Sequence, residues 1–327
     1  IVEINDTKIE KIIPELYKYY STDGNNLTGK RIGLMTSFSK YYRLHYGLTK
    51  SFNISYINSS TKKLETKSVE SIGNKAYFEN FNKIHSMPLD VFRFANLKEN
   101  QKYNYKQLDS LTGILTVHTF AMGNETTNEH KKYQQFLDSI FIDIKDKNIK
   151  NLIVDVRNNG GGQDPNDLIT YSYLTNRNFQ ENKEAWISFK KIPLIKYYNI
   201  GIPKFIRPLV VDKYNKQFQK EFPLEKDEKF YQDENSDDHK TRTPNQNAFT
   251  GNVYLLTSPR IASAGSLFAA MLAGNENTTT IGEETMGGYY GHNGHTPLEY
   301  KLPKSKIIIQ FSVVNLEQDV PKKENQK

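Results

Sequence analysis

The stretch Leu152-Ile153-Val154-Asp155-Val156-Arg157-Asn158-Asn159-Gly160-Gly161-Gly162 decides how this chain is expected to fold. Its first five residues are nearly all apolar, which is typical of a short strand in a sheet that is covered on both sides. The three glycines after the strand tolerate positive φ angles, and their N–H groups can hold a developing negative charge. Taken alone, the glycines also fit a tight turn. The Lys-Ser/Thr pair of a phosphate-binding loop is absent.

The sequence on either side of this strand predicts alternating strands and helices. Residues 113–117 read as a strand, and residues 129–145 as a helix with one apolar face, so that strand, helix and strand form a β-α-β unit. Residues 190–248 hold prolines, lysines and a polar run, and we interpret them as a partly mobile insertion packed over or beside the core. The pattern then resumes with strands at 253–257, 279–282, 299–302 and 307–313 and a helix at about 264–273.

The first hundred residues differ in character from the rest. We expect a strand at residues 1–5, a helix from the spacing of its apolar residues (Ile9, Ile12, Ile13, Leu16 and Tyr17), and a hairpin from residues 51–58 and 64–69. Residues 77–109 have weak periodicity and are interpreted as a connector. The predicted organisation is therefore one small domain at 1–100 and a larger one at 101–327, which suits a chain of 327 residues.

Composition excludes several classes of protein. Hydrophobic residues make up 37% and charged residues 25%, as in a globular protein with a core. There is no cysteine, which excludes disulfides, thiolate metal sites and a cysteine nucleophile. The net charge of +7 indicates a lysine-rich surface rather than nucleic-acid binding. No apolar run is long enough for a transmembrane helix. Because Ile1 already reads as part of a strand, we expect a segment to precede it.

A second motif, Thr257-Ser258-Pro259-Arg260-Ile261-Ala262-Ser263-Ala264-Gly265-Ser266-Leu267-Phe268-Ala269-Ala270, places a serine where a helix begins. Small neighbours leave the Ser263 hydroxyl accessible, and a helix N-terminus provides N–H groups suited to an oxyanion. These features favour a nucleophile. On this motif alone, however, the simpler interpretation is that Ser263 caps the helix, because serine is a favoured N-cap residue.

A third element, Ile281-Gly282-Glu283-Glu284-Thr285-Met286-Gly287, follows the other two. Over about residues 110–315 the three motifs resemble, in order and spacing, the C-terminal processing peptidase family of serine proteases, which includes tail-specific proteases and the tricorn core. In that family a strand enters Asp-Leu-Arg-x-Asn-x-Gly-Gly, followed by a Ser-Ala-Ser-Ala-Ser-Glu-like segment and then Ile-Gly-Glu-x-Thr-x-Gly. The resemblance changes the balance between the two interpretations of Ser263 in favour of a nucleophile.

The resemblance implies an α/β fold with a crotonase/ClpP-like peptidase core and an N-terminal PDZ-like module. It places the nucleophile at Ser263, rather than at Ser258 or Ser266, and implies an oxyanion hole formed by the Ala264 N–H and a glycine, Gly161 first and Gly162 second. It further implies peptide or unfolded-protein substrates, no cofactor and a periplasmic, cell-surface or secreted location. It leaves the oligomeric state open.

One departure from the family pattern concerns the base that a serine nucleophile needs. Many members have a lysine where this chain has Gly288, and no lysine lies between Ile281 and Tyr300. Tricorn-like members use a Ser-His-Glu arrangement whose histidine precedes the PDZ-like module. We therefore expect the base to be a histidine before Ile1, with Glu317 as a candidate acid within the chain.

Histidines within the chain offer other candidates. His292 and His295 follow the third motif and can accept a proton near neutral pH, line the substrate cleft or make loop hydrogen bonds. No third ligand accompanies them, so we predict no metal site. His118 ends a strand that runs toward the cleft, where it either contacts substrate or is structural. The remaining histidines are expected at the surface: His45, His85, His130 and His239.

Two other functions remain open from the sequence. Without a working base, the chain would be a non-catalytic peptide-binding protein on the same scaffold. An esterase-like hydrolase would use the same serine on small esters. We expect the serine endopeptidase.

Overall fold

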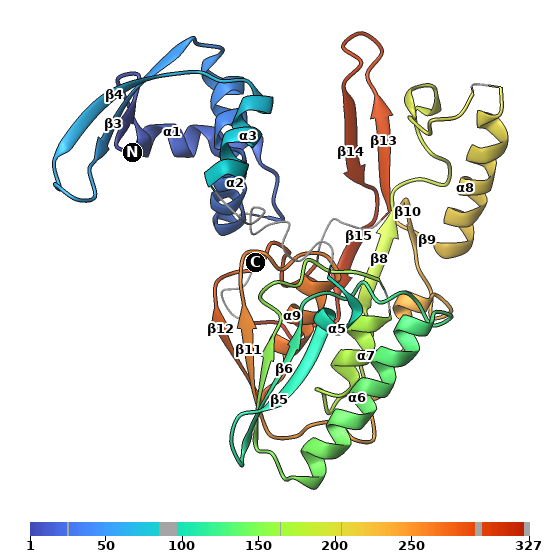
Figure 1. Ribbon diagram of the computed structural model, residues 1–327. Helices are drawn as coiled ribbons and strands as arrows, with labels where there is room; N and C mark the ends of the chain where they lie inside the picture. Colours follow the sequence, from blue (N-terminus) through green and yellow to red (C-terminus); the bar gives the residue numbers. More distant parts are fainter. Residues whose placement is uncertain (25, 85–96, 164, 204, 292–295, 324–327) are drawn as a thin grey trace. The chain divides into compact units, whose positions relative to one another are not determined.

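The computed structural model (Figure 1) describes residues 1–24, 26–84, 97–163, 165–203, 205–291 and 296–323. The chain divides into two compact units, Ile1–Lys98 and Glu99–Lys327, which are described separately. None of the helices in the described ranges combines the length and the apolar sequence needed to cross a membrane.

The first unit contains a four-stranded antiparallel sheet in the order β2-β1-β3-β4. Its core is small and consists of Ile4, Ile12, Leu16, Leu34 and Tyr42. The predicted helix after Ile9 and the predicted hairpin are confirmed. The elements are β1 (Glu3–Ile4), β2 (Thr7–Lys8), α1 (Ile9–Leu16), the 3-10 helix η1 (Tyr17–Tyr19), α2 (Leu27–Tyr46), β3 (Ser51–Ile57), β4 (Leu64–Glu70) and α3 (Asn74–Ile84).

Two helices of this unit were not predicted. The helix α2 lacks a pronounced apolar face and is kinked at Ser37, so it carries no clear helical periodicity. Its N-terminus is nevertheless capped, because the Asn26 side chain accepts a hydrogen bond from the Gly29 N–H at 2.7 Å. The helix α3 lies partly in the stretch that was interpreted as a connector.

The second unit is built on a five-stranded sheet in the order β12-β11-β7-β6-β5. Four strands are parallel and β5 is antiparallel, so β6, β7, β11 and β12 end at the same edge. The four parallel strands were predicted, whereas β5 lies in the expected connector. The bounds are β5 (Tyr103–Gln107), β6 (Thr112–Val117), β7 (Asn151–Asp155), β11 (Asn252–Thr257) and β12 (Thr278–Gly282).

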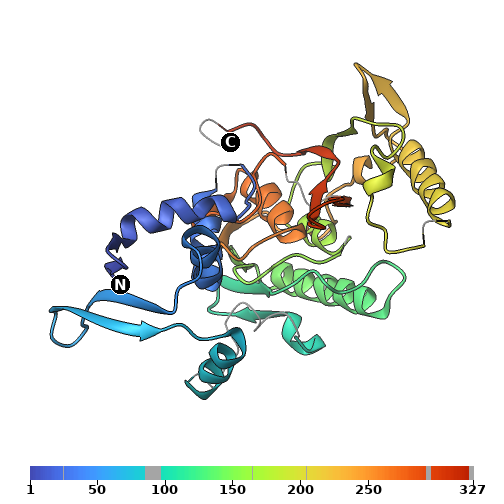
Figure 2. The same cartoon turned by 90° about the horizontal axis from the view of Figure 1, so that it is seen from above.

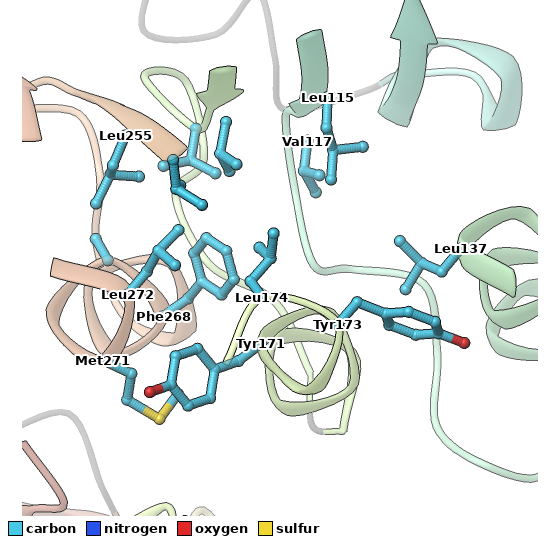
Figure 3. Close-up of a cluster of buried hydrophobic side chains, with 14 of the residues drawn as sticks. Leu115, Val117, Leu137, Tyr171, Tyr173, Leu174, Leu255, Phe268, Met271 and Leu272 are labelled. Atoms are coloured by element: carbon cyan, nitrogen blue, oxygen red, sulfur yellow. The ribbon is translucent and has the colours of Figure 1, made fainter. Parts of the chain in front are cut away.

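Helices pack against one face of this sheet. Figure 3 shows Phe268 and Leu272 of α9 directed toward strand residues such as Leu255, while Tyr171 of α7 lies beside Met271 of α9. Residues of the opposite face, such as Ile153 and Tyr254, are only part-buried. The expectation of a sheet covered on both sides is therefore met fully on the helix face and only in part on the other. The helices are α5 (Glu99–Lys102), α6 (Asn128–Asp146), α7 (Asn166–Ser172) and α9 (Ala264–Ala273).

The expected insertion belongs to a second substructure of this unit. Its strands form an antiparallel sheet in the order β15-β8-β10-β9. Strands β9 and β10 lie within residues 190–248, whereas β8 precedes and β15 follows this range. In Figure 2, α8 and the β9–β10 hairpin lie together at one side of the unit. A separate apolar cluster links this sheet to α8 and to the β13–β14 hairpin. The elements are β8 (Asn182–Ile187), η2 (Ile195–Tyr197), α8 (Arg207–Glu221), β9 (Leu224–Lys226), β10 (Lys229–Tyr231), η3 (Asp237–His239), β13 (Pro297–Lys301), β14 (Ile308–Ser312) and β15 (Asn315–Gln318).

Candidate active site

The three sequence motifs meet at one edge of the five-stranded sheet. The glycine loop follows β7, the serine motif follows β11, and the third motif follows β12. These strands are parallel neighbours, so the loops at their carboxyl ends share one edge, where ligands of open α/β sheets bind. His118 follows β6 at the same edge.

Ser263 stands at the N-terminus of α9 in a strained conformation. Its φ is 52° and its ψ is −136°, values that a residue with a side chain rarely adopts. Such strain costs of order 1–3 kcal/mol and is concentrated at functional sites. The Ser263 side chain makes no capping hydrogen bond and is exposed. Ser263 therefore occupies the N-cap position without using its hydroxyl as a cap.

The hydroxyls of the two neighbouring serines have structural partners. Ser258 Oγ donates to the Arg157 carbonyl and accepts from the Arg260 N–H at 3.1 Å. Ser266 Oγ is buried, donates to the Ile261 carbonyl at 3.0 Å and accepts from the Gly287 N–H at 3.2 Å. The Ser263 hydroxyl, by contrast, makes no hydrogen bond with any described residue.

Gly161 packs directly against this serine. Its φ is +102°, and a β-carbon placed on it would lie 2.7 Å from Ser263 Cβ and 2.8 Å from the Ala262 carbonyl oxygen. Its N–H already donates to Asn159 Oδ1 at 2.9 Å. The expected first choice of oxyanion donor is thus engaged in this conformation. The N–H groups of Gly162 and Ala264 donate to no residue in the described ranges.

Asn159 connects the site to the sheet and was not singled out from the sequence. It is fully buried, and its Nδ2 donates to the Val117 carbonyl of β6 at 3.2 Å. Its Oδ1 accepts from Gly161, and its backbone carbonyl accepts from the Ala262 N–H at 3.3 Å. One buried side chain therefore fixes the glycine loop, while its backbone holds the turn before Ser263.

Asp155, the last residue of β7, and Arg157 form a bidentate pair. Arg157 Nε donates to Asp155 Oδ1 at 2.9 Å and Arg157 NH2 donates to Oδ2 at 2.7 Å. Burial would raise the Asp155 pKa, but the hydrogen bonds and charge of Arg157, with a smaller contribution from His118, lower it below its ordinary value. The Asp-x-Arg part of the motif thus stabilises the turn that leads to the glycines.

The third motif packs beside the serine turn. The Met286 N–H donates to the Ile261 carbonyl at 2.9 Å, and Gly287 is held by Ser266. This brings Gly288, the position of the family's lysine, close to the serine motif. Gly291 then lies against the Leu316 carbonyl of β15, because a β-carbon there would come within 2.2 Å of that oxygen.

Gln318 of β15 joins two segments of the site. Its side chain is buried, and its Nε2 donates to the Leu267 carbonyl of α9 at 2.8 Å. Its backbone N–H donates to the Tyr290 carbonyl at 2.7 Å. Because the Leu267 N–H donates to the Ser263 carbonyl at 3.1 Å, Gln318 contacts the first turn of the serine's own helix. The chain just before residues 292–295 is thereby tied to that helix.

The acid candidate and the histidines lie in different surroundings. Glu317 is exposed, lies 4.0 Å from Lys183 Nζ, and lines a pocket of about 590 Å³ together with Tyr290 and Gly291. His292 and His295 lie outside the described residues. His118 is part-buried, and its backbone N–H donates to the Lys102 carbonyl at 2.8 Å.

One prediction about the remaining histidines is wrong. His130 is 3% exposed, not at the surface, because α6 turns it toward Asn166 Oδ1, which lies 2.9 Å from its Nδ1. His45 and His239 are part-buried, and His85 lies outside the described residues. In the part of the chain that the structure describes, no three His, Asp or Glu side chains are grouped so that they could hold a metal ion.

Comparison with known proteins identifies the class. The family model described as peptidase family S41 matches residues 111–312. This range is more than half of the chain and contains all three motifs, so the protein is a serine-type peptidase. The chain belongs to peptidase family S41, which confirms the resemblance to C-terminal processing peptidases. No curated protein matches the chain.

Solved structures of CPAF are similar in fold. A serine-to-alanine mutant of CPAF has a TM-score of 0.53 and 13% identity over 99% of this chain and 70% of its own. Mature CPAF complexed with lactacystin has a TM-score of 0.52 and 11% identity over 97% of this chain and 69% of its own. At such low identity the likeness concerns the fold alone.

Proposed function

We propose that the protein is a serine endopeptidase in which Ser263 forms the acyl-enzyme. One observation carries the proposal: the exposed Ser263 hydroxyl stands at a strained helix N-terminus and makes no hydrogen bond with a described residue. The neighbouring serines use their hydroxyls to hold the surrounding turns. A nucleophile must be accessible, and its hydroxyl must not be held by a structural hydrogen bond. Ser263 meets both conditions in the described structure.

In the proposed reaction, Ser263 Oγ attacks the carbonyl carbon of a peptide bond and gives its proton to a base. The negative oxygen of the tetrahedral intermediate accepts from the Ala264 N–H and from Gly162, whose N–H groups are uncommitted in the described structure. Gly161 contributes instead if its N–H leaves Asn159 when substrate binds. The base then protonates the leaving amine, and water hydrolyses the acyl-enzyme to restore the serine.

The proposed base is a histidine, since Gly288 replaces the family's lysine. The candidates are a histidine preceding Ile1 and the pair His292 and His295. Glu317 is the proposed acid, because it lines the pocket that Gly291 also lines, next to residue 292. His118 is proposed to contact substrate at the same sheet edge, where it lies near enough to Asp155 to help lower the pKa of that carboxyl.

The remaining assignments follow from the family. We propose that unit 1 is a PDZ-like module, in which the antiparallel sheet receives a peptide tail along one edge, and that unit 2 is a crotonase/ClpP-like core. Peptides or unfolded proteins would be the substrates. A periplasmic, cell-surface or secreted location is proposed by family analogy, and cell fractionation tests it.

A fluorophosphonate probe on the full-length protein tests the central assignment. We expect covalent labelling that is lost in Ser263→Ala and kept in Ser258→Ala, which changes a neighbouring serine with a structural hydrogen bond. Labelling of Ser263→Ala at the wild-type rate would overturn the assignment. A lack of labelling in the wild type would favour the non-catalytic peptide-binding protein.

Two further measurements sharpen the result. Mass spectrometry of casein digests distinguishes a peptidase from an esterase that hydrolyses only small esters. Labelling rates of His292→Ala and His295→Ala identify the base: if both variants react at the wild-type rate, the base lies elsewhere.

A further inference from the structure

The β13–β14 hairpin exposes apolar side chains that its fold does not use. One face of the hairpin carries Leu298 and Tyr300, which are buried in the second apolar cluster. At the tip end of β14, Ile307 is 58% and Ile308 is 52% exposed. A two-stranded hairpin is only marginally stable by itself. Apolar side chains that it exposes to water add nothing to its stability. Contiguous exposed apolar side chains mark an interaction surface.

A second set of apolar residues lies on the same side of the unit. In Figure 1 the hairpin tip and the N-terminal end of α8 reach the same side. Phe205 is 82% and Leu209 is 75% exposed there. The two segments are tied together, because the Asn199 N–H donates to the Glu299 carbonyl at 2.8 Å. We treat the exposed side chains of these two segments as one surface, defined as residues 194–203, 205–216 and 299–311.

The charge of the protein is concentrated in these two segments. They contain seven Lys or Arg residues and only two Asp or Glu residues, a net charge of +5 in a chain whose net charge is +7. Lys301, Lys304 and Lys306 flank the hairpin tip. One of the two acidic residues, Asp212, is neutralised by Lys216 at 2.7 Å. The surface is therefore both apolar and strongly basic.

We propose that this surface binds a membrane that contains anionic lipids. Lysines attract anionic headgroups, and their long chains let the neighbouring isoleucines reach the acyl boundary. The surface would hold the peptidase at the membrane. This binding does not depend on the identity of the nucleophile.

Vesicle flotation tests the proposal with the whole chain. We expect binding to vesicles of phosphatidylglycerol and phosphatidylcholine in 0.1 M salt, much weaker binding to phosphatidylcholine alone, and a decrease as salt is raised. Each lysine near such a surface contributes about a fivefold gain in affinity, so K301E/K304E/K306E should weaken binding at least about a hundredfold. I307S/I308S should also weaken it, and Ser263→Ala should not.

The β3–β4 hairpin provides a matched control. It also carries an exposed leucine, Leu64, beside two lysines, Lys62 and Lys63, yet it lies outside the proposed surface. K62E/K63E/L64S should bind vesicles as the wild type does, and equal melting temperatures would show that all variants fold. Equal weakening by this control, or no binding to anionic vesicles, would overturn the proposal. Self-association lost in I307S/I308S without vesicle binding would also overturn it and assign the surface to a second copy.

Discussion

Gly161 lies so close to Ser263 that a single added β-carbon would come within 2.7 Å of the serine Cβ. The two residues belong to motifs about a hundred positions apart, on the neighbouring parallel strands β7 and β11. The glycine is required here by both its φ of +102° and the space it leaves for Ser263. The contact therefore explains why the two motifs act together.

Gly161→Ala should abolish the reaction of Ser263 with a fluorophosphonate probe. The β-carbon would displace Ser263 or the Ala262 carbonyl and would strain the backbone, so we expect a loss of at least about a hundredfold in labelling rate. Gly160→Ala is the matched control, because a β-carbon at Gly160 meets nothing within 4 Å. Similar rates for the two variants would contradict the argument.

Ser266→Ala should loosen the third motif. The buried hydroxyl bridges the Ile261 carbonyl and the Gly287 N–H, and its removal leaves both groups without this partner at a cost of about 1–3 kcal/mol in the free energy of unfolding. Urea denaturation measures this change. Ser172→Ala, which removes one hydrogen bond within α7, should cost less, and the reverse order would refute the bridging role.

Gln318→Leu should slow the reaction of Ser263 without weakening probe binding. The variant keeps the apolar volume but loses the hydrogen bond to Leu267 in the serine's helix. We expect the maximum labelling rate to fall about tenfold while the half-saturating probe concentration is unchanged. Asn315→Ala, an exposed change on the same strand, is the control. A lower melting temperature with an unchanged labelling rate would mean that Gln318 is only structural.

Asp155→Asn should reduce stability at neutral pH and less so in acid. Arg157 lowers the Asp155 pKa in the folded protein despite burial, so the ionised group stabilises the fold above a pH of about 4. This contribution is lost as the pH falls through the folded-state pKa. Urea denaturation at pH 7, 5 and 3 should show that the difference in free energy of unfolding between wild type and variant becomes smaller as the pH falls. The exposed change Asp146→Asn should show no such difference at any of these pH values. A difference that is constant with pH would exclude the ion pair as its cause.

Predictions from local pattern succeeded where one stretch of sequence contains the whole signal. The helix α9 begins at Ala264 and ends at Ala273 as predicted, because small and apolar residues follow a strand and a turn. The strands β6, β7, β11 and β12 were found from their apolar runs. The sheet of β15, β8, β10 and β9 was missed, because Gln318 pairs with Asn182 and no local pattern encodes a pairing so distant in the chain.

The sequence by itself determined the family, the order of the three motifs and the position of Ser263 at the start of a helix, since these depend on neighbouring residues. Only the tertiary structure decided which groups around Ser263 already have hydrogen-bond partners. It showed Asn159 engaging the Gly161 N–H, Ser266 holding Gly287, and Ser263 with no hydrogen bond to a described residue. The physical reason is that a hydrogen bond depends on distance and direction in space, which folding sets between residues far apart in the chain.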